Sequence, residues 1–185
     1  MPKTAGDATC LMLTSVPGLV QFADPGDSND KHMPFFGREA DVAGKLLAMN
    51  IRRLPAWALS GAQHKARYGV HPSYRPGALE TLDQITSRTD ADDLLRWMTD
   101  HGRFQIDRWL RAEQLEADVL DLLGALGELT ATVRKAVLAV GRVNEGAYPR
   151  EPEREFTAEQ IARLYRMNPG WAEVERRAYG ALPVD

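Results

Sequence analysis

Apolar residues recur in alternating steps of four and three between Arg103 and Val143, the spacing of one amphipathic helix. The apolar stripe consists of Leu115, Val119, Leu122, Leu126, Leu129, Val133, Ala136 and Val140. This heptad-like spacing is typical of helices that pack lengthwise against another helix. A continuous helix over this range would be about 60 Å long. Gly124 and Gly127 weaken its middle, each by up to about 1 kcal/mol relative to alanine. We therefore expect one long helix, covered by a hairpin within the chain or by a helix of another subunit.

Shorter helices are predicted on the N-terminal side of the stripe. A helix over residues 38–53 follows from apolar residues at helical spacing, namely Val42, Leu46, Leu47 and Ile51. Pro55 suits the first turn of the next helix, which we expect to end at Gly69. A loop with two prolines separates it from a short helix carrying Leu82 and Ile85. Thr89 or Asp90 is expected to cap a further helix.

Two helices are predicted near the C-terminus, beyond a polar linker at residues 144–155. Thr157 and Gln160 match a capping box, in which each side chain binds the backbone N–H of the other residue. Asn168 is expected to cap the second helix, with Pro169 in its first turn and Gly180 closing it. We expect this helical hairpin, in the region 147–185, to pack on the body of the protein.

Residues 1–34 are predicted to form a small β-hairpin or an extended arm. Two short apolar runs, 10–14 and 19–22, flank Pro17 and Gly18. Proline and glycine suit the two central positions of a type II turn. The predicted fold is therefore all-α: a helical bundle on one long amphipathic helix at residues 35–146, preceded by this arm and followed by the C-terminal hairpin. The chain shows no internal repeat.

Composition restricts the class of protein. The 185 residues are 44% apolar and 26% charged, close to ordinary globular usage. The longest apolar runs are a few residues, so we expect no transmembrane helix and no membrane partner. The N-terminus lacks the pattern of a secretory signal. Cys10 has no partner for an internal disulfide, which fits a reducing compartment, and we expect a cytoplasmic protein.

Charge is unevenly distributed along the chain. Residues 42–79 contain six basic residues and no acidic one, whereas residues 90–130 contain ten acidic and four basic residues. The two segments either neutralise each other, within the fold or across a dimer, or the basic one binds an anionic partner. Nucleic acid is one such partner, since Tyr68 and Tyr74 alternate with basic residues. The side chains expected to bind it are Arg52, Arg53, Lys65, Arg67 and Arg75.

Signatures of catalysis are weak. The four histidines form no HExxH, HxH or ExxH motif, and the chain has no GxSxG, GxxxxGK[ST] or GxGxxG sequence. We therefore assign no catalytic residue, metal ligand or cofactor. Carboxylate pairs at i, i+3 occur as Glu80/Asp83, Glu113/Glu116 and Asp118/Asp121. The first two pairs resemble the Mg²⁺-binding pairs of helical nucleotide pyrophosphohydrolases, but in the reverse order. That resemblance implies a magnesium-dependent hydrolase; a solvated acidic face is the alternative.

The sequence thus predicts a non-enzymatic helical module for protein interaction or assembly. We expect it to self-associate through the apolar stripe, with the basic segment docking on an acidic face of a neighbour. Two alternatives stay open. One is a nucleic-acid-binding protein that uses residues 42–79, or the helix pair at 157–180, which vaguely resembles a helix-turn-helix. The other is the magnesium-dependent enzyme.

Overall fold

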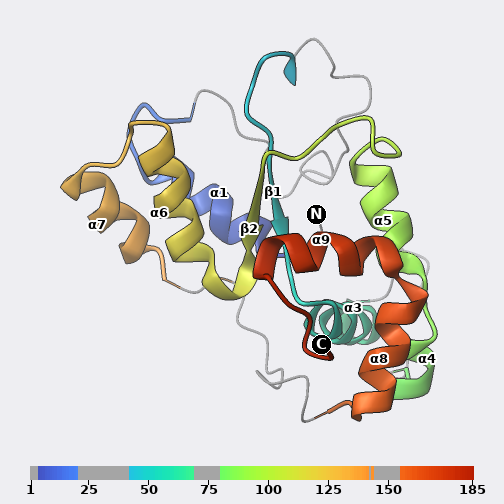
Figure 1. Cartoon of the computed structure of the whole chain (residues 1–185). Helices are drawn as coiled ribbons and strands as arrows, with labels where there is room; N and C mark the ends of the chain where they lie inside the picture. The colour runs from blue at the N-terminus through green and yellow to red at the C-terminus, as the bar shows by residue number, and fades with distance from the viewer. Residues whose placement is uncertain (1–3, 21–41, 69–79, 142, 144–154) are drawn as a thin grey trace. The chain divides into compact units, whose positions relative to one another are not determined.

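The computed structural model describes residues 4–20, 42–68, 80–141, 143 and 155–185 (Figure 1). These residues contain eight α-helices and one two-stranded sheet, so the prediction of a mainly α-helical fold is confirmed. The chain divides into two units: unit 1 comprises 1–51 with 97–146, and unit 2 comprises 52–96 with 147–185. Within the described ranges, no helix combines the length and apolar character needed to cross a membrane.

Unit 1 packs helices around a short parallel sheet. In chain order its elements are α1 (Gly6–Thr14), β1 (Ala48–Ile51), β2 (Arg108–Arg111), the 3₁₀ turn η2 (Ala112–Gln114), α6 (Leu115–Ala125) and α7 (Ala131–Ala139). The strands pair from Ala48 opposite Arg108 to Ile51 opposite Arg111. Helices α1, α6 and α7 lie together (Figure 1) and enclose an apolar core that includes Met12, Val119 and Val137.

The helix predicted over residues 38–53 is wrong in its described part, because β1 forms there instead. The carbonyl of Leu47 accepts the backbone N–H groups of Asp107 and Arg108, and the Asp107 carboxylate accepts the Leu47 N–H at 2.8 Å. Residues 49–51 are all buried. A short strand buried on both faces has no alternation of apolar and polar residues, so periodicity alone does not distinguish it from a helix.

The predicted N-terminal hairpin is also wrong, since residues 6–14 form α1. Ala8, Thr9 and Met12 are buried at helical spacing against the core of unit 1. The Thr9 hydroxyl accepts a hydrogen bond from the Asn50 side chain at 2.7 Å, which ties α1 to β1. Residues 21–34 of the predicted arm lie outside the described residues, as do most of the linker at 144–155 and the loop after Gly69.

The predicted long helix is wrong: the chain from residue 103 to 143 is broken twice. Residues 108–114 form β2 and η2 before α6 begins. At the end of α6, Gly127 adopts a φ of 77°, and the Glu128 N–H bonds to the Leu123 carbonyl while the Gly127 N–H bonds to that of Gly124. This pair of bonds is a Schellman motif. The Thr130 hydroxyl then caps α7 by accepting the Val133 N–H at 3.2 Å.

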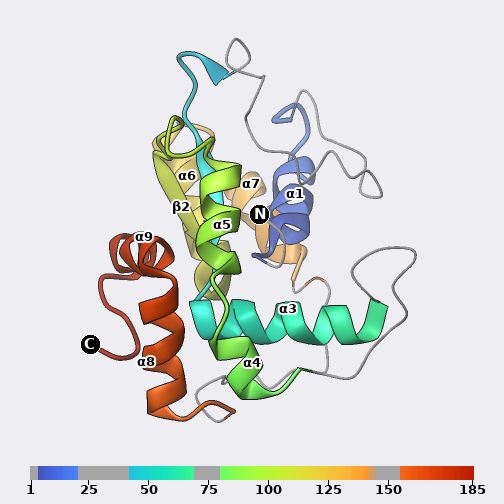
Figure 2. The ribbon, with the colours of Figure 1, turned by 90° about the vertical axis from the view of Figure 1, so that its right-hand side faces the viewer.

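Unit 2 confirms the helices predicted on either side of the stripe. Its elements are α3 (Leu54–Tyr68), α4 (Leu82–Thr86), α5 (Asp90–Met98, whose last two residues belong to unit 1), α8 (Ala158–Met167) and α9 (Pro169–Tyr179). Helix α8 packs beside α4 (Figure 2). Trp171 of α9 is fully buried, with its ring centroid 5.0 Å from that of Trp57 on α3.

The N-terminal ends of α8 and α9 differ from each other. Thr157 and Gln160 form the predicted capping box of α8. Asn168 does not cap α9, because its side chain bonds to the carbonyls of Arg88 and Leu164 instead. Asp92 of α5 replaces it, accepting the N–H groups of Gly170 at 2.9 Å and Trp171 at 2.7 Å. A carboxylate at this position is favoured by the helix dipole, and it joins α5 to α9.

Candidate functional site

The apolar stripe is mostly covered within unit 1. Leu115, Val119 and Leu122 of α6 are buried in the core of this unit, and Leu129, Val133 and Val140 are half-buried against the same core. Leu126, at the end of α6, is 51% exposed. The turn after α6 lets the second half of the stripe fold back on the first, so the hairpin within the chain, one of the two predicted arrangements, covers these side chains.

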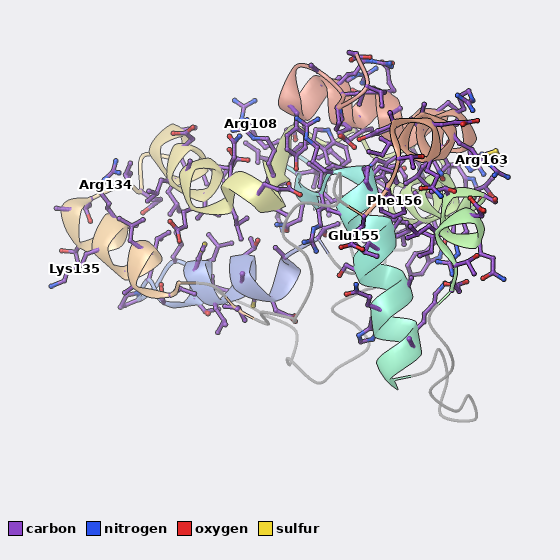
Figure 3. All side chains as sticks on the ribbon, turned by 90° about the horizontal axis from the view of Figure 1, so that it is seen from below. Arg108, Arg134, Lys135, Glu155, Phe156 and Arg163 are labelled. Carbon is purple, nitrogen blue, oxygen red and sulfur yellow. The ribbon has the colours of Figure 1, made fainter. Side chains whose placement is uncertain are left out.

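The outer face of α7 is basic and partly apolar. Arg134 and Lys135 are exposed on this helix, and Figure 3 shows both on its outer part. Leu138 follows them at i+4 and i+3, on the same face, and is 47% exposed. The helix contains no acidic residue. Its opposite side carries Val137 into the core. An exposed leucine beside two cations is therefore available for contact from outside unit 1.

The outer face of α6 has the opposite charge. Glu116 and Asp121 are exposed on this helix, about 140° apart around its axis. The small residues Ala117, Gly124 and Ala125 are also exposed and lie next to Asp121, at i−4, i+3 and i+4. In the part of the chain that the structure describes, neither carboxylate forms an ion pair or hydrogen bond, and the same holds for Arg134 and Lys135. Unit 1 thus presents an acidic face on α6 and a basic face on α7, which we call the paired faces.

Arg53, one of the residues predicted to bind an anionic partner, is held by contacts within unit 2. Arg53 packs over the Tyr179 ring at 4.0 Å and donates hydrogen bonds to Glu175 at 3.0 Å and to the Ala181 carbonyl at 2.6 Å. The Arg52 carbonyl accepts the Trp171 indole N–H at 3.1 Å. Arg53 is therefore held by unit 2 itself.

Lys65 lies 3.8 Å from the Asp90 carboxylate. Its burial and the nearby Arg88 charge lower the pKa of the Lys65 ammonium, and Asp90 opposes the change. The side chains of Arg67 and Arg75 lie outside the described part of the chain. Arg53 and Lys65 thus contact acidic groups of the described chain, and the five-residue site for an anionic partner stays a prediction.

The pair Glu80/Asp83 belongs to unit 2, and the other two carboxylate pairs belong to unit 1. Asp83 accepts a hydrogen bond from Gln160 at 3.1 Å, and Glu80 pairs with Arg88. Asp118 is buried, and its carboxylate accepts hydrogen bonds from two nitrogens of the Arg111 guanidinium. It also accepts the backbone N–H of Arg111 at 2.6 Å. Across the described ranges, no three His, Cys, Asp or Glu side chains gather as metal ligands would.

An open apolar groove of about 420 Å³ lies in unit 2, between α8 and the end of the chain. Its walls are formed by Phe156, Ala158, Ile161, Ala162, Pro183 and Val184. None of these side chains carries a charge or a hydrogen-bonding group. The side chains of the groove therefore offer apolar contact, but no polar side chain that would select an occupant.

The outer face of α7 was not predicted from the sequence. The prediction of one helix over residues 103–143 placed Leu126 in the middle of a continuous stripe. It gave no role to Arg134, Lys135 and Leu138. The signals that separate the two helices were present, namely Gly127 as a helix stop and Thr130 as an N-cap. A division there predicts two helices with separate outer faces.

Comparisons with known proteins give no guide to the function. No protein-family model, no curated protein and no solved structure matches this chain.

Proposed function

We propose that this chain is a non-enzymatic helical protein-interaction module that self-associates through the outer faces of α6 and α7. The observation that carries the proposal is the exposure of Leu138 and Leu126, at 47% and 51%, on helices whose outer charged groups have no partner among the described residues. A protein contact surface has an apolar centre and a polar rim, and α7 presents a leucine with cations next to it.

The expected association is weak. Full burial of one leucine contributes about 1.5–3 kcal/mol, and these leucines are already half covered in unit 1. A dissociation constant of 1 μM corresponds to about 8 kcal/mol, and association also costs translational and rotational freedom. We therefore expect a dissociation constant in the micromolar range rather than the nanomolar range, so that the oligomeric state changes with concentration.

The test is sedimentation velocity of Leu138→Ser, with Leu46→Ser as the matched control. Leu46 precedes β1 and is 41% exposed, so its replacement changes a similar side chain away from α6 and α7. A reductant is present throughout, because Cys10 is exposed and can link two copies by oxidation. Leu138→Ser is expected to weaken association, while the control does not. Equal behaviour of the two variants, each with a native circular dichroism spectrum, would contradict the proposal.

No specific observation favours either alternative function, nucleic-acid binding or magnesium-dependent hydrolysis. The nucleic-acid prediction used Arg52, Arg53, Lys65, Arg67 and Arg75. Of these, Arg53 and Lys65 contact Glu175 and Asp90, and the side chains of Arg67 and Arg75 lie outside the described residues. The magnesium-dependent hydrolase relied on two carboxylate pairs that would have to converge on one cation. Glu80 and Asp83 instead contact Arg88 and Gln160.

A further inference from the structure

We infer that the partner of the paired faces is a second copy of this chain, with α7 of each copy packed on α6 of the other. This inference rests on the proposed function and specifies its contact. Each copy carries both faces, so a two-fold arrangement forms the same contact twice and leaves neither face uncovered.

Charge complementarity is the first argument. The outer face of α7 carries Arg134 and Lys135 and no acid, whereas the outer face of α6 carries Glu116 and Asp121 and no base. Two copies that exchange these faces place cations opposite carboxylates at both contacts. Complementary faces of this kind fix the partner and its orientation more than they add affinity.

The sizes of the side chains give the second argument. On α6 the residues exposed next to Asp121 are Ala117, Gly124 and Ala125. Small side chains let a second helix approach closely, and the Leu138 side chain needs such a surface to become buried. On α7, Leu138 stands one turn after both cations. A leucine on these small residues therefore brings Arg134 and Lys135 close to Asp121, which lies among them.

The acidic face also weighs against a polyanionic partner. Nucleic acid binds through cations whose field is not cancelled by nearby acids. Glu116 and Asp121 lie on α6, which packs directly against α7 in the same unit, and repel phosphate. A second copy of the chain instead offers cations to the acids of α6 and acids to the cations of α7.

The experiment reverses each face separately and then together. Variant A carries Arg134→Glu and Lys135→Glu, variant B carries Glu116→Lys and Asp121→Lys, and variant C carries all four. The control carries Arg163→Glu and Arg166→Glu on α8, two exposed cations of unit 2 without an ion pair among the described residues; Arg163 is labelled in Figure 3. Dissociation constants are measured by sedimentation velocity at about 50 mM salt, where charge effects are strong.

Variants A and B are each expected to self-associate about tenfold more weakly than the wild type or worse, which corresponds to about 1.4 kcal/mol. Variant C and an equimolar mixture of A with B are expected to recover most of the affinity, since opposite charges again face each other. The α8 control is expected to match the wild type. Circular dichroism confirms that each variant is folded.

The outcomes separate this inference from the proposed function. If Leu138→Ser weakens association but A and B leave it unchanged, the module self-associates and the exchange of α6 and α7 is wrong. The exchange is also wrong if A weakens association while B does not, or if A mixed with B stays apart. A wild-type chain that is monomeric at every concentration overturns both.

Discussion

Glu175 of α9 is a fully buried carboxylate with three hydrogen-bond donors. It accepts the Tyr165 hydroxyl at 2.6 Å, the Leu54 backbone N–H at 2.9 Å and the Arg53 guanidinium at 3.0 Å. These bonds join α3, α8 and α9 at one point of unit 2. An ionised carboxylate taken out of water is costly unless it is paired in this way. Arg53 is therefore a structural residue of unit 2.

The same site makes stability depend on pH. Burial raises the pKa of the Glu175 carboxyl above its usual value of 4.5, and the bonds from Tyr165, Leu54 and Arg53 oppose this rise. A group with a raised pKa holds its proton more tightly in the folded state. Its contribution to stability is thus complete below the unfolded pKa and is lost as the pH rises through the folded pKa.

Arg53→Met tests this account, because it removes the cation and leaves Glu175 buried. We expect the free energy of unfolding near pH 7 to fall by about 3–5 kcal/mol. The loss should shrink near pH 4, where Glu175 is protonated. Arg177→Met is the control; it breaks an exposed pair with Glu173 whose side chains are 71% and 59% exposed, and should cost less than about 1 kcal/mol. Urea unfolding at both pH values measures the difference; an equal loss at both would contradict it.

At the scale of elements, the turn between α6 and α7 determines the structure of the stripe. Gly127 adopts a φ of 77°, a conformation that costs other residues about 1–2 kcal/mol. Gly124, three residues earlier, lies within α6, and a Cβ atom there would meet only Leu129, at an ordinary 3.6 Å. The two glycines therefore have different roles, although a continuous helix would make them equivalent.

Alanine at each glycine distinguishes the turn from a continuous helix. We expect Gly127→Ala to lower the free energy of unfolding by about 1 kcal/mol, because it forces alanine into the left-handed region. Gly124→Ala is expected to raise it by up to about 1 kcal/mol, because alanine favours helix. Urea unfolding of the full chain measures both. If both alanines stabilise the protein, residues 115–140 form one helix and the turn is wrong.

Local signals predicted some elements and not others. The capping box at Thr157, the proline in the first turn of α3 and the glycine after α9 correctly located three helices, because such signals act within one turn. Strand β1 was missed since its identity depends on pairing with β2, sixty residues away in the chain. The cap of α9 was misassigned for the same reason, because Asp92 reaches it from α5.

At the scale of the whole molecule, each unit combines two separate segments of the chain. The predicted division at residues 34 and 146 followed composition, which does not report contacts between distant segments, and it stays a prediction. For the candidate surface, the sequence predicted the type of surface, a helical face with apolar and charged residues, but not the residues that form it. The position of this surface on α6 and α7 could be found only from the structure. The stripe residues of these two helices mostly pack against each other and against α1, so they do not form the exposed surface.

The central claim is that the chain associates with itself. Light scattering coupled to size exclusion, in reductant and over a wide range of loading concentrations, measures the molar mass directly. The account predicts a mass that rises with concentration from 20.6 kDa, the mass of one chain, towards twice that value. A mass that stays at 20.6 kDa up to several hundred micromolar, well above the expected dissociation constant, would contradict it.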